Sequence, residues 1–161
     1  MFVTRLSTLL PCFYSWRPEP LAEATDAFLQ DWSLVHSYAN PPWCLIQRCL
    51  KKTILQRATL VMITPLWRTQ SWFLTILSLC IDYPRILPQT SIYYFPQPTR
   101  EFHGMAWHIS GNPSRTEEFQ EKLRNSSSRP GETPLTKAMI QPGGSGKSGV
   151  IRNMSIPFLP L

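Results

Sequence analysis

The sequence predicts an α/β fold in which a parallel sheet is flanked by helices. Between residues 21 and 81, amphipathic segments alternate with short apolar runs in the order helix, strand, helix, strand, helix. This alternation is typical of parallel sheets, because parallel strands need a long connection that usually forms a helix. The chain also has 16 prolines among its 161 residues, so we expect short elements separated by irregular stretches.

The elements of the first half follow from local patterns. Residues 1–20 are interrupted by prolines and are expected to be irregular. Residues 21–32 (LAEATDAFLQDW) are good helix formers with apolar positions on one face, which predicts a helix. Residues 33–39 form a short apolar run typical of a buried strand. Residues 44–56 divide into an apolar and a polar side, which predicts an amphipathic helix. Residues 58–65 (ATLVMITP) are continuously apolar, which favours a strand covered on both faces.

The second half is less regular. Residues 71–81 return to a helical pattern. Short strand candidates follow, divided by prolines and glycine, at residues 85–88, 91–95 and 105–110. From residue 111 the composition shifts to Ser, Pro and Gly, so residues 111–161 are expected to be a flexible, largely irregular tail with one short helix at 114–124. The α/β domain would then span residues 21–110.

The stretch QPGGSGKS (residues 141–148) resembles a phosphate-binding loop only in part. Such a loop needs glycine, four residues, then Gly-Lys-Ser/Thr after a strand. Gly146, Lys147 and Ser148 are present, but Gln141 occupies the first glycine position and no apolar strand precedes it. We therefore interpret this stretch as flexible linker.

The charge balance makes polyanions plausible partners. Lys and Arg number 16 against 10 Asp and Glu, which gives a net charge of +6 and a pI near 9.4. The basic residues are scattered, and Arg48, Lys51 and Lys52 form the only tight group. A charge excess of this size is more often a solvated surface than a nucleic-acid site.

Cysteine usage indicates a reducing, intracellular environment, nuclear or cytoplasmic. The 4 cysteines show no CxxC spacing, so we expect free buried thiols at Cys12, Cys44, Cys49 and Cys80. The apolar run at the N-terminus is interrupted by polar residues and proline, which argues against a signal peptide. The 3 histidines are dispersed, so no metal site is expected.

No membrane segment is expected either. The most apolar stretch, residues 72–81, is about half as long as a membrane-spanning helix, and Arg68 and Gln70 precede it.

The stretch YANPPW (residues 38–43) has the Asn-Pro-Pro-aromatic pattern of enzymes that methylate exocyclic amino groups of bases. The lone pair of such an amine is delocalised into the ring, so the site must accept hydrogen bonds from the NH2 group. The side chain of Asn40 and the rigid backbone of Pro41 and Pro42 offer acceptors, and Trp43 would stack on a flipped base. The alternative is a proline turn that ends a strand and starts a helix.

A longer stretch, FYSWRPEPLAEATDAFLQDWSLVHSYANPPWCLIQRCLKKTILQRATLVMITPLWRTQSWFLTIL, resembles polyproteins of DIRS-type retrotransposons. In that family, a Dam-like methyltransferase module lies between the RNase H and tyrosine recombinase regions. The later segments AWHISGNPSRTEEF and RPGETPLTKAMIQPGGSGKSGVIRNMSIPFLPL resemble the linker before the arm-binding domain of the recombinase. The matching motif positions are Ser15–Pro20, Asp26–Phe28, Trp32, Tyr38–Ile46, Pro65, Trp67, Gln70 and Trp72.

The resemblance implies a partial Rossmann-like sheet, a base-binding site and a polyprotein origin. Asn40, Pro41, Pro42 and Trp43 match the catalytic motif, and Trp67 and Trp72 would help to shape the base pocket, although aromatic core packing is the more common role. An intact relative would use S-adenosylmethionine, but no F-x-G-x-G turn for it occurs in these residues. We therefore expect a module truncated at both ends, without a bound cofactor and without activity on its own.

Two further hypotheses remain open. In the first, the chain is a nucleic-acid-binding accessory segment of a recombinase that contacts DNA or RNA through Arg48, Lys51, Lys52, Trp67 and Trp72. In the second, it is a genomic remnant without a selected function.

Overall fold

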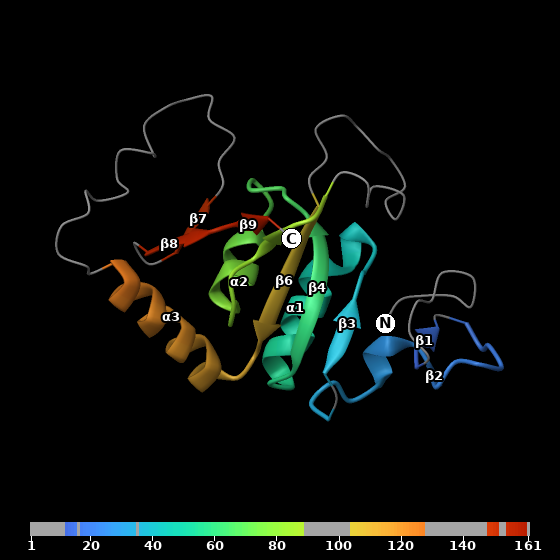
Figure 1. Ribbon diagram of the computed structural model, residues 1–161. Coiled ribbons are helices and arrows are strands. Elements are labelled where there is room, and N and C mark those ends of the chain that lie inside the picture. Colours follow the sequence, from blue (N-terminus) through green and yellow to red (C-terminus); the bar gives the residue numbers. More distant parts are fainter. Residues whose placement is uncertain are drawn as a thin grey trace.

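The computed structural model describes residues 12–15, 17–34, 36–88, 104–127, 148–151 and 154–160. Its centre is a five-stranded sheet with the strand order β3-β4-β6-β5-β9 (Figure 1). The strands are β3 (Ser37–Ala39), β4 (Thr59–Pro65), β5 (Arg85–Ile86), β6 (Gly104–Ser110) and β9 (Leu159–Pro160). The α-helices are α1 (Ile46–Leu55), α2 (Phe73–Ser78) and α3 (Pro113–Ser127).

The sheet is mixed, so the prediction of a parallel sheet holds only in part. Strands β3 and β4 are parallel and α1 connects them, as the alternating pattern predicted. Strand β6, however, pairs antiparallel with β4 along its full length and antiparallel with β5. Because β6 occupies the middle of the sheet, the wholly parallel arrangement is wrong. The overall α/β class is confirmed.

Most of the expected elements occur where the local patterns placed them. Helix α1, strand β4 and helix α2 fall inside the predicted ranges 44–56, 58–65 and 71–81. Strands β3, β5 and β6 match the other short apolar runs, with β6 beginning one residue earlier than expected. The strand predicted at 91–95 lies outside the described residues.

The helix predicted for residues 21–32 is wrong. This segment contains the short strand β2 (Ala24–Thr25), which pairs with β1 (Tyr14–Ser15), and a 3₁₀ turn, η1 (Ala27–Leu29). Asp26 explains the change, because it has a positive φ of 53° and its carboxylate accepts a hydrogen bond from the Phe28 amide at 2.9 Å. A side chain that caps a turn in this way competes with helical hydrogen bonding.

The described parts of the two terminal segments are more regular than expected. Strand β1 falls within residues 1–20. Helix α3 has 15 residues and buries Phe119 and Leu123 against the core. Beyond it, β7 (Ser148–Ile151) and β8 (Met154–Pro157) form a hairpin, and β9 joins the main sheet beside β5. The tail therefore contributes to the fold at both of its described ends.

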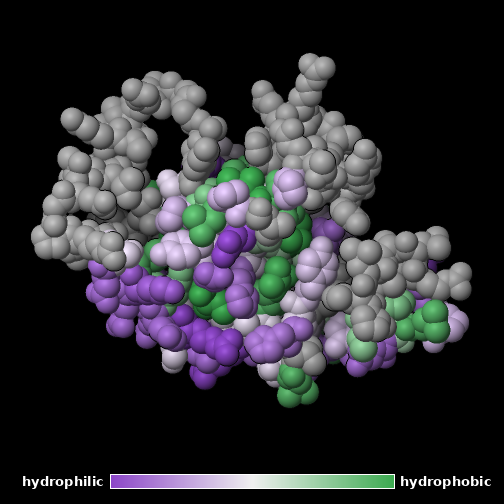
Figure 2. Space-filling model, viewed as in Figure 1, coloured by the Kyte–Doolittle hydropathy of each residue, from purple (hydrophilic) through white to green (hydrophobic). Residues whose placement is uncertain are grey.

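The two faces of the sheet differ. One face packs against α1 and α2 through fully buried side chains such as Met62 and Trp107, which are opposite each other on β4 and β6. In Figure 1, α1 lies behind these strands. Side chains alternate along a strand, so Tyr38, Val61 and His108 share the opposite face, where each is partly exposed. Figure 2 shows apolar and polar side chains mixed on the side that faces the viewer.

Helix α1 ends in a Schellman motif. The Ala58 amide donates to the Thr53 carbonyl at 3.0 Å and the Arg57 amide donates to the Ile54 carbonyl at 3.2 Å. This geometry requires a left-handed residue, and Arg57 provides it with a φ of 50°. Gly111 packs against the same turn, where a Cβ atom would lie 2.9 Å from the Ile54 Cα.

We expect Arg57→Gly to stabilise the fold. A left-handed conformation costs a residue with a Cβ atom roughly 1 kcal/mol, and glycine avoids that cost. The matched control is Arg57→Ala, which removes the guanidinium and keeps the strained Cβ. Urea denaturation should therefore give the glycine variant a free energy of unfolding about 1 kcal/mol above that of the alanine variant. Equal stabilities would contradict this account.

Candidate functional site

The Asn-Pro-Pro-Trp segment and Trp67 meet at one edge of the sheet. Asn40–Trp43 directly follow β3, and Trp67 follows β4 by two residues. Because β3 and β4 are parallel, their carboxyl ends lie at the same edge, which is where ligands bind in open α/β sheets. The Trp43 and Trp67 rings are in edge-to-face contact, with centroids 4.6 Å apart at 74°. Two separate motifs of the sequence thus form one aromatic cluster.

The two prolines shape the path from strand to helix. Pro41 is buried, and Pro42 caps the 3₁₀ turn η2 (Trp43–Leu45), which leads directly into α1. The Leu45 amide donates to the Pro42 carbonyl at 2.8 Å. The interpretation as a strand-to-helix turn is therefore correct for the backbone, and it leaves the base-binding hypothesis open for the side chains.

Asn40 stands at the start of this turn with a half-buried side chain. Within the described part of the chain, its carboxamide forms no hydrogen bond, so its oxygen can accept one from a ligand. Trp43 packs on Ile63 and, like Trp67, also against the main core, and both indole rings are half-buried. The cluster thus consists of two partly exposed indole rings, and Asn40 precedes Trp43 by three residues in the same turn.

Trp72 does not belong to this cluster. Its side chain is only 5% exposed and is part of the main core, with its ring 6.4 Å from that of Phe73. We assign it to packing, which is the alternative that the sequence favoured for both downstream tryptophans.

The basic residues of α1 partly serve the fold. The Arg48 guanidinium lies 3.9 Å from the centroid of the Phe28 ring, and the Lys52 ammonium lies 5.4 Å from that of Trp32. These cation–π contacts join α1 to the segment that replaces the expected helix. Lys51 is exposed. The helix therefore offers a weaker polyanion surface than its sequence suggests.

The thiols fall into two groups. Cys49 and Cys80 are buried as predicted, and burial raises the pKa of the Cys49 thiol to about 12 and that of Cys80 also well above its ordinary value. Cys12 and Cys44 are exposed, so the expectation of burial is wrong for them.

Among the residues that the structure describes, no three His, Cys, Asp or Glu side chains gather closely enough to hold a metal ion. No helix in the same residues is long and apolar enough to cross a membrane.

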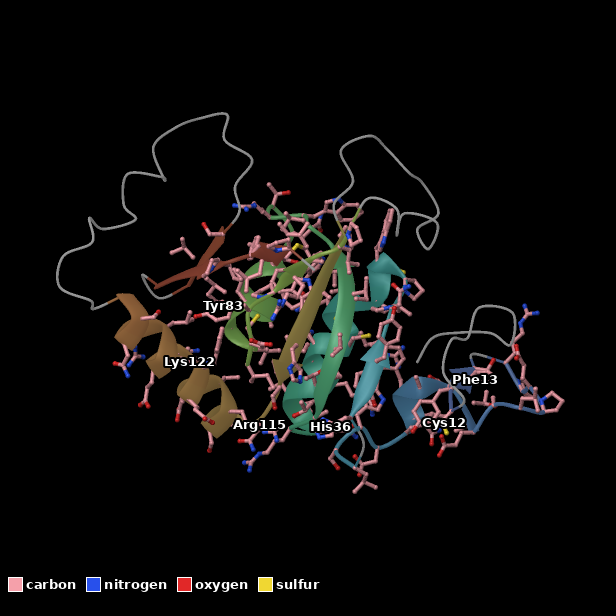
Figure 3. All side chains as sticks on the ribbon, viewed as in Figure 1. Cys12, Phe13, His36, Tyr83, Arg115 and Lys122 are labelled. Carbon is pink, nitrogen blue, oxygen red and sulfur yellow. The ribbon has the colours of Figure 1, made fainter. Side chains whose placement is uncertain are left out.

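A second polar site lies at the opposite edge of the sheet, and sequence reasoning missed it. A depression of about 220 Å³ is lined by Ser33, Leu34, His36, Arg57, Thr59, Asn112 and Arg115. Figure 3 shows His36 and Arg115 at this edge, where β3 and β4 begin. Its residues come from three segments that are far apart in the sequence, so no motif spacing could have revealed it.

His108 lies on the open face of the sheet, opposite Val61 of β4. Burial lowers the pKa of its imidazole, the carboxylate of Asp82 opposes this shift, and electrostatic interactions with His36 and Arg115 add to it. The folded protein therefore favours neutral His108.

The comparisons with known proteins found no match, whether to a family model, a curated protein or a solved structure. The function must therefore be argued from the residues and their geometry.

We expect His108 to make the protein less stable in mild acid. Since its folded pKa lies below the ordinary value of 6.5, the unfolded chain binds more protons as the pH falls through that value. Stability is complete above this range and decreases below it. Denaturation at about pH 7.5 and about pH 5.5 should show a smaller loss for His108→Gln than for the unmodified chain. His36→Gln removes a smaller contribution to the lowered His108 pKa, so it should reduce the loss less than His108→Gln does. Equal losses in the unmodified chain and His108→Gln would contradict the assignment.

Proposed function

We propose that the chain is a methyltransferase-like module of a retrotransposon polyprotein that binds an unpaired nucleobase without transferring a methyl group on its own. The base would lie at the edge formed by Asn40–Trp43 and Trp67. The observation that carries this proposal is the contact between Trp43, which follows Asn40 by three residues, and Trp67, at the carboxyl ends of two parallel strands.

The chemistry of this edge suits an amino-bearing base. A partly exposed indole offers a π-face on which a base can stack, and stacking tolerates any base. Selectivity would come from Asn40, whose carboxamide oxygen can accept a hydrogen bond from the NH2 group of adenine or cytosine. Thymine and uracil have no exocyclic NH2 group. The site should therefore prefer adenine and cytosine, as the motif's resemblance to amino-methyltransferases implies.

Binding rather than turnover is proposed because methyl transfer also requires a methyl donor. The glycine-rich turn F-x-G-x-G that would hold S-adenosylmethionine in a relative does not occur in this sequence. This chain's own residues would orient the base and accept hydrogen bonds from its amino group. Labelled methyl transfer from S-adenosylmethionine to DNA, abolished by Asn40→Ala, would contradict the binding-only proposal.

The net charge of +6 supports a nucleic-acid ligand in a general way. The basic face of α1 adds less specific support, because Arg48 and Lys52 already contact aromatic rings. We therefore place recognition at the aromatic edge and treat the basic residues as a source of salt-sensitive attraction.

The test is a fluorescence titration with short single-stranded oligonucleotides of adenine, cytosine or thymine. Trp67→Ala should weaken binding of all three by roughly tenfold, because stacking on an aromatic ring contributes about 1–3 kcal/mol per base. Asn40→Ala should weaken binding to the adenine and cytosine oligonucleotides and leave thymine unchanged.

The matched controls are Leu74→Ala, an exposed apolar residue on α2, and Asn125→Ala, an exposed asparagine on α3. Both should bind like the unmodified chain. A Trp67→Ala variant that is folded and binds normally would overturn the proposed base site, as would an Asn40→Ala variant with unchanged base preference.

A further inference from the structure

The depression at the amino ends of β3 and β4 is strongly cationic. Arg57 and Arg115 line it together with His36, and no acidic side chain contributes to its lining. It therefore differs from an ordinary surface groove, where cations and carboxylates are usually interspersed. In Figure 2 a polar region extends along α3 and this lower edge of the molecule.

The two guanidinium groups reach the depression from different elements. Arg57 is the left-handed residue just past the end of α1, and Arg115 lies in the first turn of α3. Among the described residues, neither forms an ion pair. Arg115 does donate a hydrogen bond from Nη1 to the Thr59 hydroxyl at 3.2 Å, which holds it over the start of β4. Two like charges brought together without a carboxylate between them repel each other, and a bound anion would relieve that repulsion.

Hydroxyl and amide groups complete the lining. The Thr59 hydroxyl lies 2.9 Å from the Ser110 hydroxyl, and Ser33 and Asn112 add further polar side chains. The Asn112 oxygen already accepts the Ser114 amide at 3.1 Å, so its NH2 group remains as a donor. Because Asn112 caps α3 in this way, the depression's affinity for anions rests on the side chains and not on the helix end.

Arg115 is shared with a neighbouring depression of about 380 Å³, which is lined by Ile81, Asp82, Glu118, Phe119 and Lys122 as well. That second depression contains both signs of charge. Asp82 and Glu118 contribute carboxylates to its lining, whereas the first depression is lined by basic and uncharged residues. An anion is therefore expected in the first of the two.

We propose that the depression formed by His36, Arg57, Thr59, Asn112 and Arg115 binds a phosphate group. Guanidinium forks match phosphate oxygens, and hydroxyl and amide donors can satisfy those that remain. A volume of about 220 Å³ accommodates a phosphate with one or two ester substituents. The ligand is thus a phosphate monoester, such as a nucleotide, or a phosphodiester of a nucleic-acid backbone.

This site is independent of the proposed base site. Strand β4 runs from Thr59 at one edge to Pro65 at the other, and at about 3.3 Å per residue the two edges are roughly 20 Å apart. A variant at one edge should therefore leave the other unaffected, which makes the two proposals separately testable.

The experiment is a titration of the full chain with inorganic phosphate, followed by NMR of the backbone amides and arginine Nε–H groups. The chain should bind phosphate saturably, with shifts at Arg57, Arg115 and Thr59. Arg115→Gln should weaken binding about tenfold, because a charge-assisted hydrogen bond is lost. The matched control is Arg124→Gln, which removes the same charge further along α3 and should bind like the unmodified chain.

Arg57→Gly is a second variant that separates loss of binding from loss of folding. This variant should be at least as stable as the unmodified chain, so weaker phosphate binding cannot come from unfolding. The proposal is overturned if the unmodified chain shows no saturable binding, or if Arg124→Gln weakens it as much as Arg115→Gln does. It is also overturned if folded Arg57→Gly and Arg115→Gln both bind phosphate normally.

Two further titrations identify the source of the phosphate. Adenosine monophosphate tests the monoester, and an oligonucleotide without terminal phosphates tests the diester. If Arg115→Gln weakens binding of the nucleotide alone, the site recognises a phosphate monoester. If it weakens binding of the oligonucleotide, the site recognises a phosphodiester of the backbone. If neither ligand responds, no phosphate ester is recognised and the proposal fails. Trp67→Ala should leave inorganic phosphate binding unchanged, and loss of that binding would show that the two edges are not separate sites.

Discussion

The rest of the structure depends on how Trp107 is buried in the middle of the sheet. Its side chain is fully inaccessible, and a buried indole N–H needs a hydrogen-bond acceptor, which the Thr64 hydroxyl provides at 2.8 Å. The ring meets Phe73 of α2 and Phe158 beside β9 edge to face, with centroids 6.0 and 5.7 Å away. One side chain therefore joins β6 to β4, to a helix and to the last described strand. This explains why a segment near the chain's end belongs to the same core as its middle.

The elements that were predicted best are those in which the local spacing of apolar residues determines the secondary structure. The apolar residues Ile46, Cys49 and Leu50 of α1 repeat at helical intervals and are fully buried, whereas Ile54 and Leu55 near its end are exposed. The antiparallel direction of β6 has no such local signature, because an apolar strand pairs equally well in either direction and the choice depends on distant contacts such as that of Trp107 with Thr64. The expected helix at 21–32 failed for a related reason. Its helix formers were outweighed by pairing with β1 and by Trp32, whose indole N–H donates to the Ala27 carbonyl at 2.7 Å.

The same distinction applies to the two edges of the sheet. Asn40, Trp43 and Trp67 could be anticipated because two motifs each follow a strand, and parallel strands end at one edge. The sequence could not show that Trp72 has a different role. A tryptophan in the core and a tryptophan in a binding site are the same residue type and differ only in burial. Arg57 and Arg115 are each single basic residues that belong to no motif in the sequence. Only the chain's path brings them to one depression.

Helix α1 connects the two edges physically. It begins directly after the turn that holds Trp43 and ends at Leu55, two residues before Arg57. Its buried face packs against β4, so it is held as a rigid spacer, and its 10 residues span about 15 Å. The same helix therefore begins at the Asn-Pro-Pro-Trp turn and determines where Arg57 lies. Because a glycine would suit the left-handed position of Arg57 better, the stability of the helix end does not account for an arginine there. An anion at the depression would account for it, since the left-handed turn projects that residue from the end of α1 at the depression's rim.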